Sequence, residues 1–278
     1  MSVRPRASTM SRVALGAVAA LVYAFLYLPL IVVIIYAFNS ATITSWPPGQ
    51  PSLHWFNVLW NDPDPRDAIA NSLKVAVTAT LLAVLLGTPA AFALQRFRFF
   101  GKESLGFVIT LPILLPGIIT GIAMLTWFTQ LIQWGVLPGL SLLTVTIGHA
   151  TFCIVLVFNN VLARLRRTTR SLEEASMDLG ADGWQTFWKV TLPSIRGALI
   201  AGALLAFTLS FDEIIVTFFL IGAQNTLPLW ILGHIRQDTN FPEIDAAAVV
   251  IIAVSIPIVL LAQFLTREAA QSGSPAKL

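Results

Sequence analysis

Charged residues are scarce in this chain: only 11% of its 278 residues are Asp, Glu, Lys or Arg, whereas 56% are hydrophobic. Soluble domains usually carry about a quarter charged residues, so the composition argues against a soluble protein and indicates a polytopic membrane protein. The formal net charge of +3 is too small to indicate a nucleic-acid partner.

Cysteine and the common catalytic motifs are also missing. The one cysteine, Cys153, excludes an intrachain disulfide and a cysteine-based metal site. The histidines His54, His149 and His234 lie far apart and lack the spacing of metal ligands. The sequence contains no phosphate-binding glycine loop, dinucleotide fingerprint or nucleophile elbow. We therefore expect no metal, no catalytic residue, no cofactor and no ATP site in this chain.

Long hydrophobic runs dominate what is present. A bilayer core about 30 Å thick needs about 20 apolar helical residues. Six runs qualify, at residues 12–38, 71–94, 105–134, 142–165, 197–222 and 246–266. The first is too long for a cleaved signal peptide, so we read it as a retained anchor. The third contains Pro112, Pro116 and Gly117 and is predicted to be kinked or re-entrant.

The positive charges alternate between the ends of these runs. Fourteen of the 17 Lys and Arg fall in residues 1–12, between the second and third runs, in or next to 166–196, or in 267–278. The positive-inside rule then makes both termini cytoplasmic and makes 39–70 an extracytoplasmic loop. We predict an all-α protein in which residues 1–278 form one transmembrane domain of six helices.

The longest polar stretch, "EEASMDLGADGWQTFWKVTLP" (173–193), lies on the predicted cytoplasmic side. Ser171 and Glu174 have the spacing of a capping box, and Gly180 is a natural helix terminator. A second short helix is predicted to end before Pro193. This pattern predicts a helix–turn–helix bracket at the membrane surface. By itself it is compatible with an amphipathic loop resting on lipid or with a docking element for a cytoplasmic partner.

The spacing of this stretch resembles the EAA motif of permease subunits in binding-protein-dependent ABC importers, EAA-x3-G-x9-I-x-LP. Every position is in register, with mild departures at Ser176 and Val190. The resemblance covers nearly the whole chain. "NSLKVAVTATLLAVLLGTPAAFALQRF", "LPILLPGIITGIAML" and "LLAFTLSFDEIIVTFFLIG" are similar to successive helices of these permeases, the last one to the second permease subunit of spermidine/putrescine systems.

The resemblance implies a type I importer permease fold and a multi-pass subunit in the bacterial inner membrane. Its implied partners are a dimer of ATP-binding subunits that holds ATP and Mg, a second and distinct permease chain, an extracytoplasmic substrate-binding protein, and membrane lipid. It also implies that the bracket is a coupling helix moved by the ATPase. The implied coupling residues are Glu174, Ala175, Ser176, Asp178, Gly180, Val190, Leu192 and Pro193.

Two adjacent carboxylates, Asp212 and Glu213, fall inside the fifth predicted span. Ionisable groups at membrane depth are costly and by default indicate function. Successive helical residues point about 100° apart, so at most one carboxylate faces a pathway squarely. A polyamine substrate would explain acids and aromatic rings along a pathway. The alternative is an interaction with the partner permease or a role in gating. The candidate pathway residues are Asp212, Glu213, Thr208, Phe211 and Phe219.

Alternative functions remain open at this point. The substrate of the same kind of importer could instead be thiamine, an iron complex, a phosphonate or an opine. A self-sufficient secondary transporter or channel is disfavoured by the EAA spacing and by the absence of clear inverted repeats. A membrane enzyme is disfavoured because no nucleophile–base or metal set is present.

Overall fold

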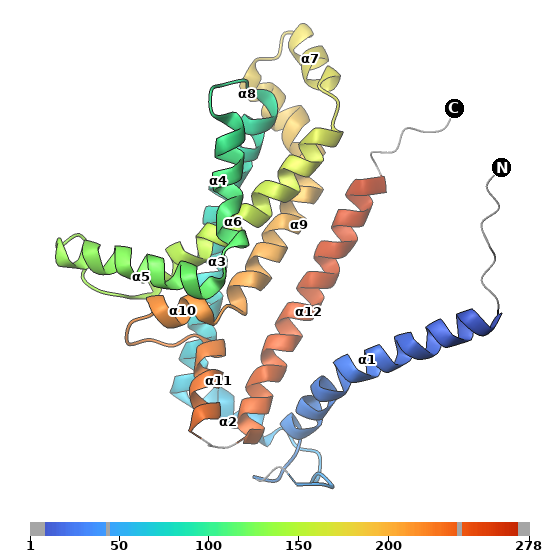
Figure 1. Ribbon diagram of the computed structural model, residues 1–278, viewed down its shortest axis with the longest axis vertical. Coiled ribbons are helices and arrows are strands. Elements are labelled where there is room, and N and C mark those ends of the chain that lie inside the picture. Colours follow the sequence, from blue (N-terminus) through green and yellow to red (C-terminus); the bar gives the residue numbers. More distant parts are fainter. Residues whose placement is uncertain (1–8, 43–44, 238–240, 272–278) are drawn as a thin grey trace. The chain divides into compact units, whose positions relative to one another are not determined.

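The chain is built from helices. The computed structural model describes residues 9–42, 45–237 and 241–271 (Figure 1). Within these ranges the secondary structure is helical apart from one isolated bridge between Asn39 and Pro51. The long helices are α1 (Thr9–Ala37), α3 (Pro63–Arg96), α6 (Leu142–Arg167), α9 (Leu192–Phe211) and α12 (Phe241–Gln271). The shorter ones are α2 (His54–Asn61), α4 (Lys102–Leu114), α5 (Gly117–Gln133), α7 (Ser171–Asp178), α8 (Gly183–Thr186), the π-helix η1 (Phe187–Thr191), α10 (Ile215–Leu220) and α11 (Leu227–Arg236).

Each predicted span overlaps one or two of these helices. In the described residues, five helical stretches are long and apolar enough to cross a membrane, and the bent pair α4–α5 is a sixth candidate. The chain bends by 106° between the two helices of that pair. Pro116 disfavours a helical conformation at Leu115, which is extended (φ −85°, ψ 141°) and ends α4. The predicted break is confirmed, although Pro112 lies inside α4.

The predicted loop at 39–70 contains helical segments in the structure. Helix α2 begins at His54, and α3 begins at Pro63, eight positions before the predicted start of the second span. A proline is tolerated in the first turn of a helix, where the backbone N–H has no partner, and Asp64 there suits the helix dipole. The prolines of this stretch therefore open α3 instead of extending the loop.

The described residues form two compact units. The first comprises the chain up to Asp62 together with His234–Val250. Its small core is formed by Ala37, Trp55 and Ala246. The side-chain oxygen of Asn39 accepts a hydrogen bond of 2.7 Å from the Gly49 N–H and so fastens the loop that follows α1.

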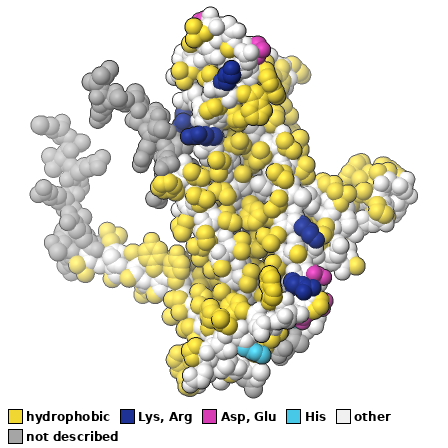
Figure 2. Space-filling view, turned by 180° about the vertical axis from the view of Figure 1, so that it is seen from behind, with side chains coloured by type: hydrophobic (Ala, Val, Ile, Leu, Met, Phe, Trp, Pro, Cys, Tyr) yellow, Lys and Arg dark blue, Asp and Glu magenta, His cyan; other side chains and the backbone are white. Residues whose placement is uncertain are grey.

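The second unit comprises Pro63–Gly233 and the chain from Ile251 onward. Its centre is the packing of α3, α6 and α9, which lie side by side with α7 and α8 beyond one end (Figure 1). Small residues allow the close approach: a Cβ on Gly87 would lie 3.0 Å from the carbonyl oxygen of Ile154, and one on Gly202 would lie 3.2 Å from the Cα of Val157. Hydrophobic side chains are spread over the face in Figure 2, interspersed with uncharged groups, as is typical of a surface in contact with lipid.

The fifth predicted span, 197–222, is wrong as one continuous helix. Helix α9 ends at Phe211, residues 212–214 are not helical, and α10 begins at Ile215. Neither proline nor glycine marks this break. Asp212 and Glu213 therefore lie at a junction between two helices. The 100° angle between successive residues of a regular helix does not apply to their side chains.

Candidate coupling loop and substrate pathway

Helix α7 ends in a glycine turn. Gly180 has φ +90°, and its N–H bonds to the Met177 carbonyl at 2.9 Å. The next N–H, of Ala181, bonds to the Ser176 carbonyl at 3.1 Å. Together these two bonds form a Schellman motif, which needs a left-handed residue at the position of Gly180. A Cβ there would meet no atom within 4 Å, so the requirement for glycine is conformational and not steric.

The start of α7 differs from the prediction. Ser171 is the first helical residue, Arg170 is the N-cap residue, and no side-chain hydrogen bond caps this end. The predicted capping box of Ser171 and Glu174 is therefore wrong, because Ser171 already has helical geometry. Helix α8 has the cap instead: Asp182 accepts a hydrogen bond of 2.7 Å from the Gln185 N–H.

The motif residues divide between an outer and an inner side of the bracket. Most of them are exposed, and a smaller group is half-buried. The hydroxyl of Ser176 lies 3.2 Å from that of Thr186, so α7 and α8 are held together by a polar contact. Glu174, Ala175, Asp178, Gly180 and Pro193 are exposed, whereas Ser176, Val190 and Leu192 are half-buried.

Pro193 does not end a helix, contrary to the prediction. It lies at the second position of α9, and α8, η1 and α9 follow one another without a gap. Proline lacks an N–H and clashes with the carbonyl four residues earlier in a regular helix. The five π-helical residues just before α9 widen the helix there, and the Leu192 N–H bonds to the Phe187 carbonyl. The chain therefore enters α9 through the π-helix η1.

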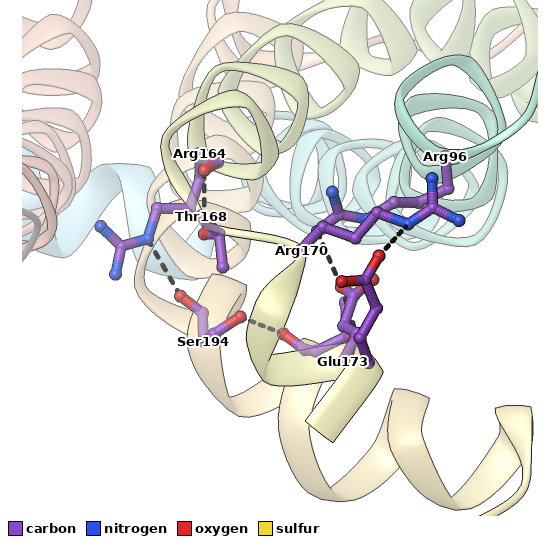
Figure 3. A network of polar contacts seen from close by, with 8 residues as sticks. Arg96, Arg164, Thr168, Arg170, Glu173 and Ser194 are labelled. Carbon is purple, nitrogen blue, oxygen red and sulfur yellow. Dashed lines mark hydrogen bonds and ion pairs between the residues drawn. The ribbon is translucent and has the colours of Figure 1, made fainter. Parts of the chain in front are cut away.

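One ion pair and several hydrogen bonds tie the bracket to the membrane helices (Figure 3). Arg96, at the end of α3, donates to the carboxylate of Glu173 over 2.7 Å. On the other arm, the Arg164 Nε–H of α6 donates to the Ser194 carbonyl over 3.0 Å. The Ser194 hydroxyl in turn donates to the Thr191 carbonyl over 2.7 Å. The loop is thus fastened to α3, α6 and α9.

Aromatic rings make a further link between the bracket and α3. Phe187 packs edge-on against Phe92 of α3, with ring centroids 5.8 Å apart. Trp184 and Trp188 pack against each other at 5.5 Å, yet their residues are 70% and 50% exposed. Large exposed rings beside a polar motif are typical of a surface that binds lipid or protein.

The two carboxylates of the helix junction have different surroundings. An oxygen of Glu213 accepts hydrogen bonds from the Ile215 and Val216 N–H groups, at 2.9 and 3.1 Å, and so caps the start of α10. Asp212 is exposed, and the Ser255 hydroxyl of α12 lies 3.3 Å from each of its oxygens. Glu213 therefore serves the local fold, and Asp212 is the more accessible acid.

A buried histidine holds the two sides of this junction. His149 of α6 is 1% exposed. Its Nδ1 lies 2.8 Å from the Ser210 hydroxyl of α9, and its Nε2 lies 2.9 Å from the Thr217 hydroxyl of α10. Thr217 donates its proton to the Glu213 carbonyl, so it accepts from Nε2–H, and in the neutral ring Nδ1 accepts from Ser210. Sequence reasoning missed this role because only the fold brings the three residues together.

The other predicted pathway residues make packing contacts. Phe211 is buried and stacks on Phe207 with centroids 5.8 Å apart. Phe219 lies over Gly121, where a Cβ would be 2.5 Å from its ring. The Thr208 hydroxyl donates to the Leu204 carbonyl over 3.1 Å. Among the five predicted residues, Asp212 is the acid whose side chain is most open to a solute.

A hollow of about 410 Å³ lies elsewhere in the second unit, between the ends of α3, α4 and α6. Charged and polar groups line it, among them Gln95, Lys102, Glu103, Asn159 and Arg166. None of the predicted pathway residues lines this hollow.

Known proteins similar to this chain place it in a family. The family described as binding-protein-dependent transport system inner membrane component matches residues 79–270. The putrescine transport system permease protein PotI of Escherichia coli K12 is 40% identical over 236 residues, 83% of this chain and 82% of that protein. The spermidine/putrescine transport system permease protein PotC of the same strain is 32% identical over 250 residues, 89% of this chain and 91% of that protein.

The fold agrees with this family assignment as well. A chain of a bacterial ABC transporter involved in the import of the acidic polysaccharide alginate superimposes with a TM-score of 0.67 at 20% identity, over 95% of this chain and 99% of that one. The family predicted from the EAA spacing is therefore confirmed. This chain belongs to the inner membrane components of binding-protein-dependent transport systems, and it is a permease subunit of an ABC importer.

Proposed function

We propose that this permease moves a polyamine, putrescine or spermidine, into the cell by alternating access. Two relatives similar over most of the chain are named for these amines. The single structural observation that supports the substrate class is the exposed carboxylate of Asp212, at a helix junction flanked by apolar helices. An acid in such surroundings attracts a cationic amine and makes no useful contact with an anion.

The bracket formed by α7, α8 and η1 is proposed to be the surface that receives the ATPase. Its exposed side presents Glu174, Ala175 and Gly180, together with the rings of Trp184 and Trp188. A rigid turn transmits a displacement, whereas a flexible one absorbs it. The Schellman turn and the ties to α3, α6 and α9 supply that rigidity.

ATP and Mg are proposed to bind to a dimer of separate ATP-binding subunits. A second permease, a distinct chain, would complete the pathway, and an extracytoplasmic binding protein would deliver the amine. When the ATPase pair closes, the bracket moves with it and the pathway opens outward. This chain performs no chemistry of its own in the proposed cycle.

The proposed orientation has both termini in the cytoplasm. The two inner connections that carry most of the positive charge are the one after α3 and the one that contains the bracket. The contact of Arg96 with Glu173 supports their common side, since it joins the end of α3 to α7. An excess of Lys and Arg on one side of the spans marks the cytoplasmic face.

The first test is uptake of labelled putrescine and spermidine by cells that carry the whole transport system, with and without this chain. Uptake that depends on the chain supports the proposal. If the complex assembles and hydrolyses ATP but neither amine enters, the polyamine assignment is wrong and the permease assignment is kept. A ligand screen on the cognate binding protein would then include thiamine, iron complexes, phosphonates and opines.

A further inference from the structure

Glu173 lies just outside the EAA spacing, yet its side chain makes a buried contact of the bracket. Its carboxylate oxygen Oε1 lies 2.7 Å from Nη2 of Arg96, and the two side chains are only 9% and 8% exposed. The Thr191 hydroxyl donates to the same oxygen over 3.0 Å. Three segments therefore meet at one atom: the end of α3, the first turn of α7, and the end of η1. Figure 3 shows the first two, with Arg96 directed at Glu173.

The next residue, Glu174, faces the other way. Successive helical residues point about 100° apart, so adjacent glutamates in α7 cannot share an environment. Glu174 lies 3.5 Å from Arg170, and these two side chains are 59% and 62% exposed. An exposed pair of this kind contributes little, because water screens it. One glutamate of the pair is thus turned toward the membrane helices and the other toward the partner side.

The buried pair also has little freedom to exchange partners. Nε of Arg96 is buried and has no hydrogen-bond partner among the described residues. The guanidinium therefore depends on Glu173, and removing one member would leave a buried charge uncompensated. Such a contact holds its two segments at a set distance and resists both separation and sliding.

We propose that the Arg96–Glu173 ion pair, with Thr191 as its third member, is the joint that passes movement of the docked bracket to α3. This inference rests on the proposed coupling role of the bracket. Helix α3 packs along α6 and α9, so displacement of its end reaches the core of the second unit. Arg96 and Glu173 are positioning residues in this scheme, and Glu174 and Gly180 belong to the docking side.

The test uses the complete transport complex in proteoliposomes with its binding protein and labelled putrescine. The variants are Glu173→Gln, Arg96→Gln and the exchanged pair Arg96→Glu with Glu173→Arg. Arg98→Gln is the matched control, because Arg98 is exposed two positions further along. Three quantities are measured: ATPase subunit recovered with the permease, ATP hydrolysed, and amine transported per ATP.

Each single variant is expected to lower amine transported per ATP about tenfold while the ATPase remains bound and active, since a lone buried charge disrupts the joint. Thr191→Val should give a smaller loss, about threefold, because it removes one hydrogen bond to the Glu173 carboxylate and leaves the ion pair with Arg96 in place. The exchanged pair should regain part of the transport, and Arg98→Gln should match the unaltered chain. A merely structural role would lower assembled complex and transport together and leave the ratio unchanged.

Unchanged transport per ATP in both Glu173→Gln and Arg96→Gln would contradict the proposed role of the ion pair. So would loss of the ATPase subunit from them, since the pair would then serve docking instead of transmission. Failure of the proposed function has a different signature: the unaltered chain itself would retain no ATPase or would move no amine. If a single variant is poorly expressed, the exchanged pair decides, because it contains no uncompensated charge. If the exchanged pair assembles and transports no better than the single variants, the proposed role of the ion pair is wrong.

Discussion

Nε2 of His149 lies 2.9 Å from the hydroxyl oxygen of Thr217, and this contact joins α6 to α10. The other ring nitrogen, Nδ1, lies 2.8 Å from the hydroxyl oxygen of Ser210 in α9. One buried ring thus contacts a residue before and a residue after the non-helical residues 212–214. Because the break contains no proline or glycine, it depends on such contacts and on the Glu213 cap to persist. The position of the accessible carboxylate of Asp212 is consequently set by a histidine that no solute reaches.

Replacing this histidine should loosen the junction. His149→Ala leaves the Ser210 and Thr217 hydroxyls without their partner and opens a cavity, which should lower the free energy of unfolding by about 2–4 kcal/mol. The measurement is thermal unfolding of the purified chain in detergent. His54→Ala, at an exposed position, is the control. Equal melting temperatures for both variants would contradict the clamp.

The turn after α7 should be intolerant of any side chain at its left-handed position. Gly180→Ala should cost about 1–2 kcal/mol locally, because a Cβ clashes with its own backbone at φ +90°. Gly180→Asp should abolish uptake, with membrane insertion intact. Gly183→Ala is the matched control, since a Cβ there also meets no atom within 4 Å and its backbone is not left-handed. Normal uptake with Gly180→Asp at normal expression would refute the coupling role.

The two acids of the junction should respond differently to neutralisation. Asp212→Asn should raise the KM for putrescine about tenfold with little change in assembly, because a direct charge contact with the amine is lost. Glu213→Ala should instead destabilise the chain by about 1 kcal/mol, since it removes the cap of α10. Uptake kinetics and thermal unfolding are measured for these two variants and for Glu213→Gln, which keeps a side-chain oxygen but removes the charge. If Asp212→Asn and Glu213→Gln leave uptake kinetics unaltered, neither carboxylate contacts the substrate.

Close packing between α5 and α10 should make one glycine sensitive to size. A Cβ at Gly121 would lie 2.5 Å from the Phe219 ring, so Gly121→Ala should cost about 1–3 kcal/mol of stability. Phe219→Leu in the same chain should restore part of it by vacating the space. Gly139→Ala, where a Cβ meets nothing within 4 Å, serves as the control. A melting temperature unchanged by Gly121→Ala would show that α5 and α10 are less tightly packed than described.

Local chemistry accounts for what could be predicted without the fold. Apolar runs of sufficient length predicted the membrane helices, and Pro116 predicted the bend between α4 and α5. Gly180 predicted the turn after α7. The register of glutamate, glycine and proline identified the family. Each of these signals is a property of one short segment, and a segment presents it whatever its neighbours are.

The errors arose where a segment depends on distant partners. The break after Phe211 is stabilised by His149, which lies 61 positions before Ser210 in the chain. For Glu173 the sequence made no prediction, and its burial follows from Arg96, 77 positions earlier. Pro193 was read as a helix end because a regular helix cannot hold it, whereas the π-helix η1 accommodates it.

The sequence by itself determined the helical class, the membrane spans, the glycine turn and the family, because hydrophobic length, backbone preference and motif spacing are local quantities. Only the tertiary structure decided which glutamate is buried, which carboxylate of the junction is accessible, and where the fifth span divides. Those outcomes depend on hydrogen bonds and ion pairs between helices, and a buried polar group adopts whichever position gives it a partner.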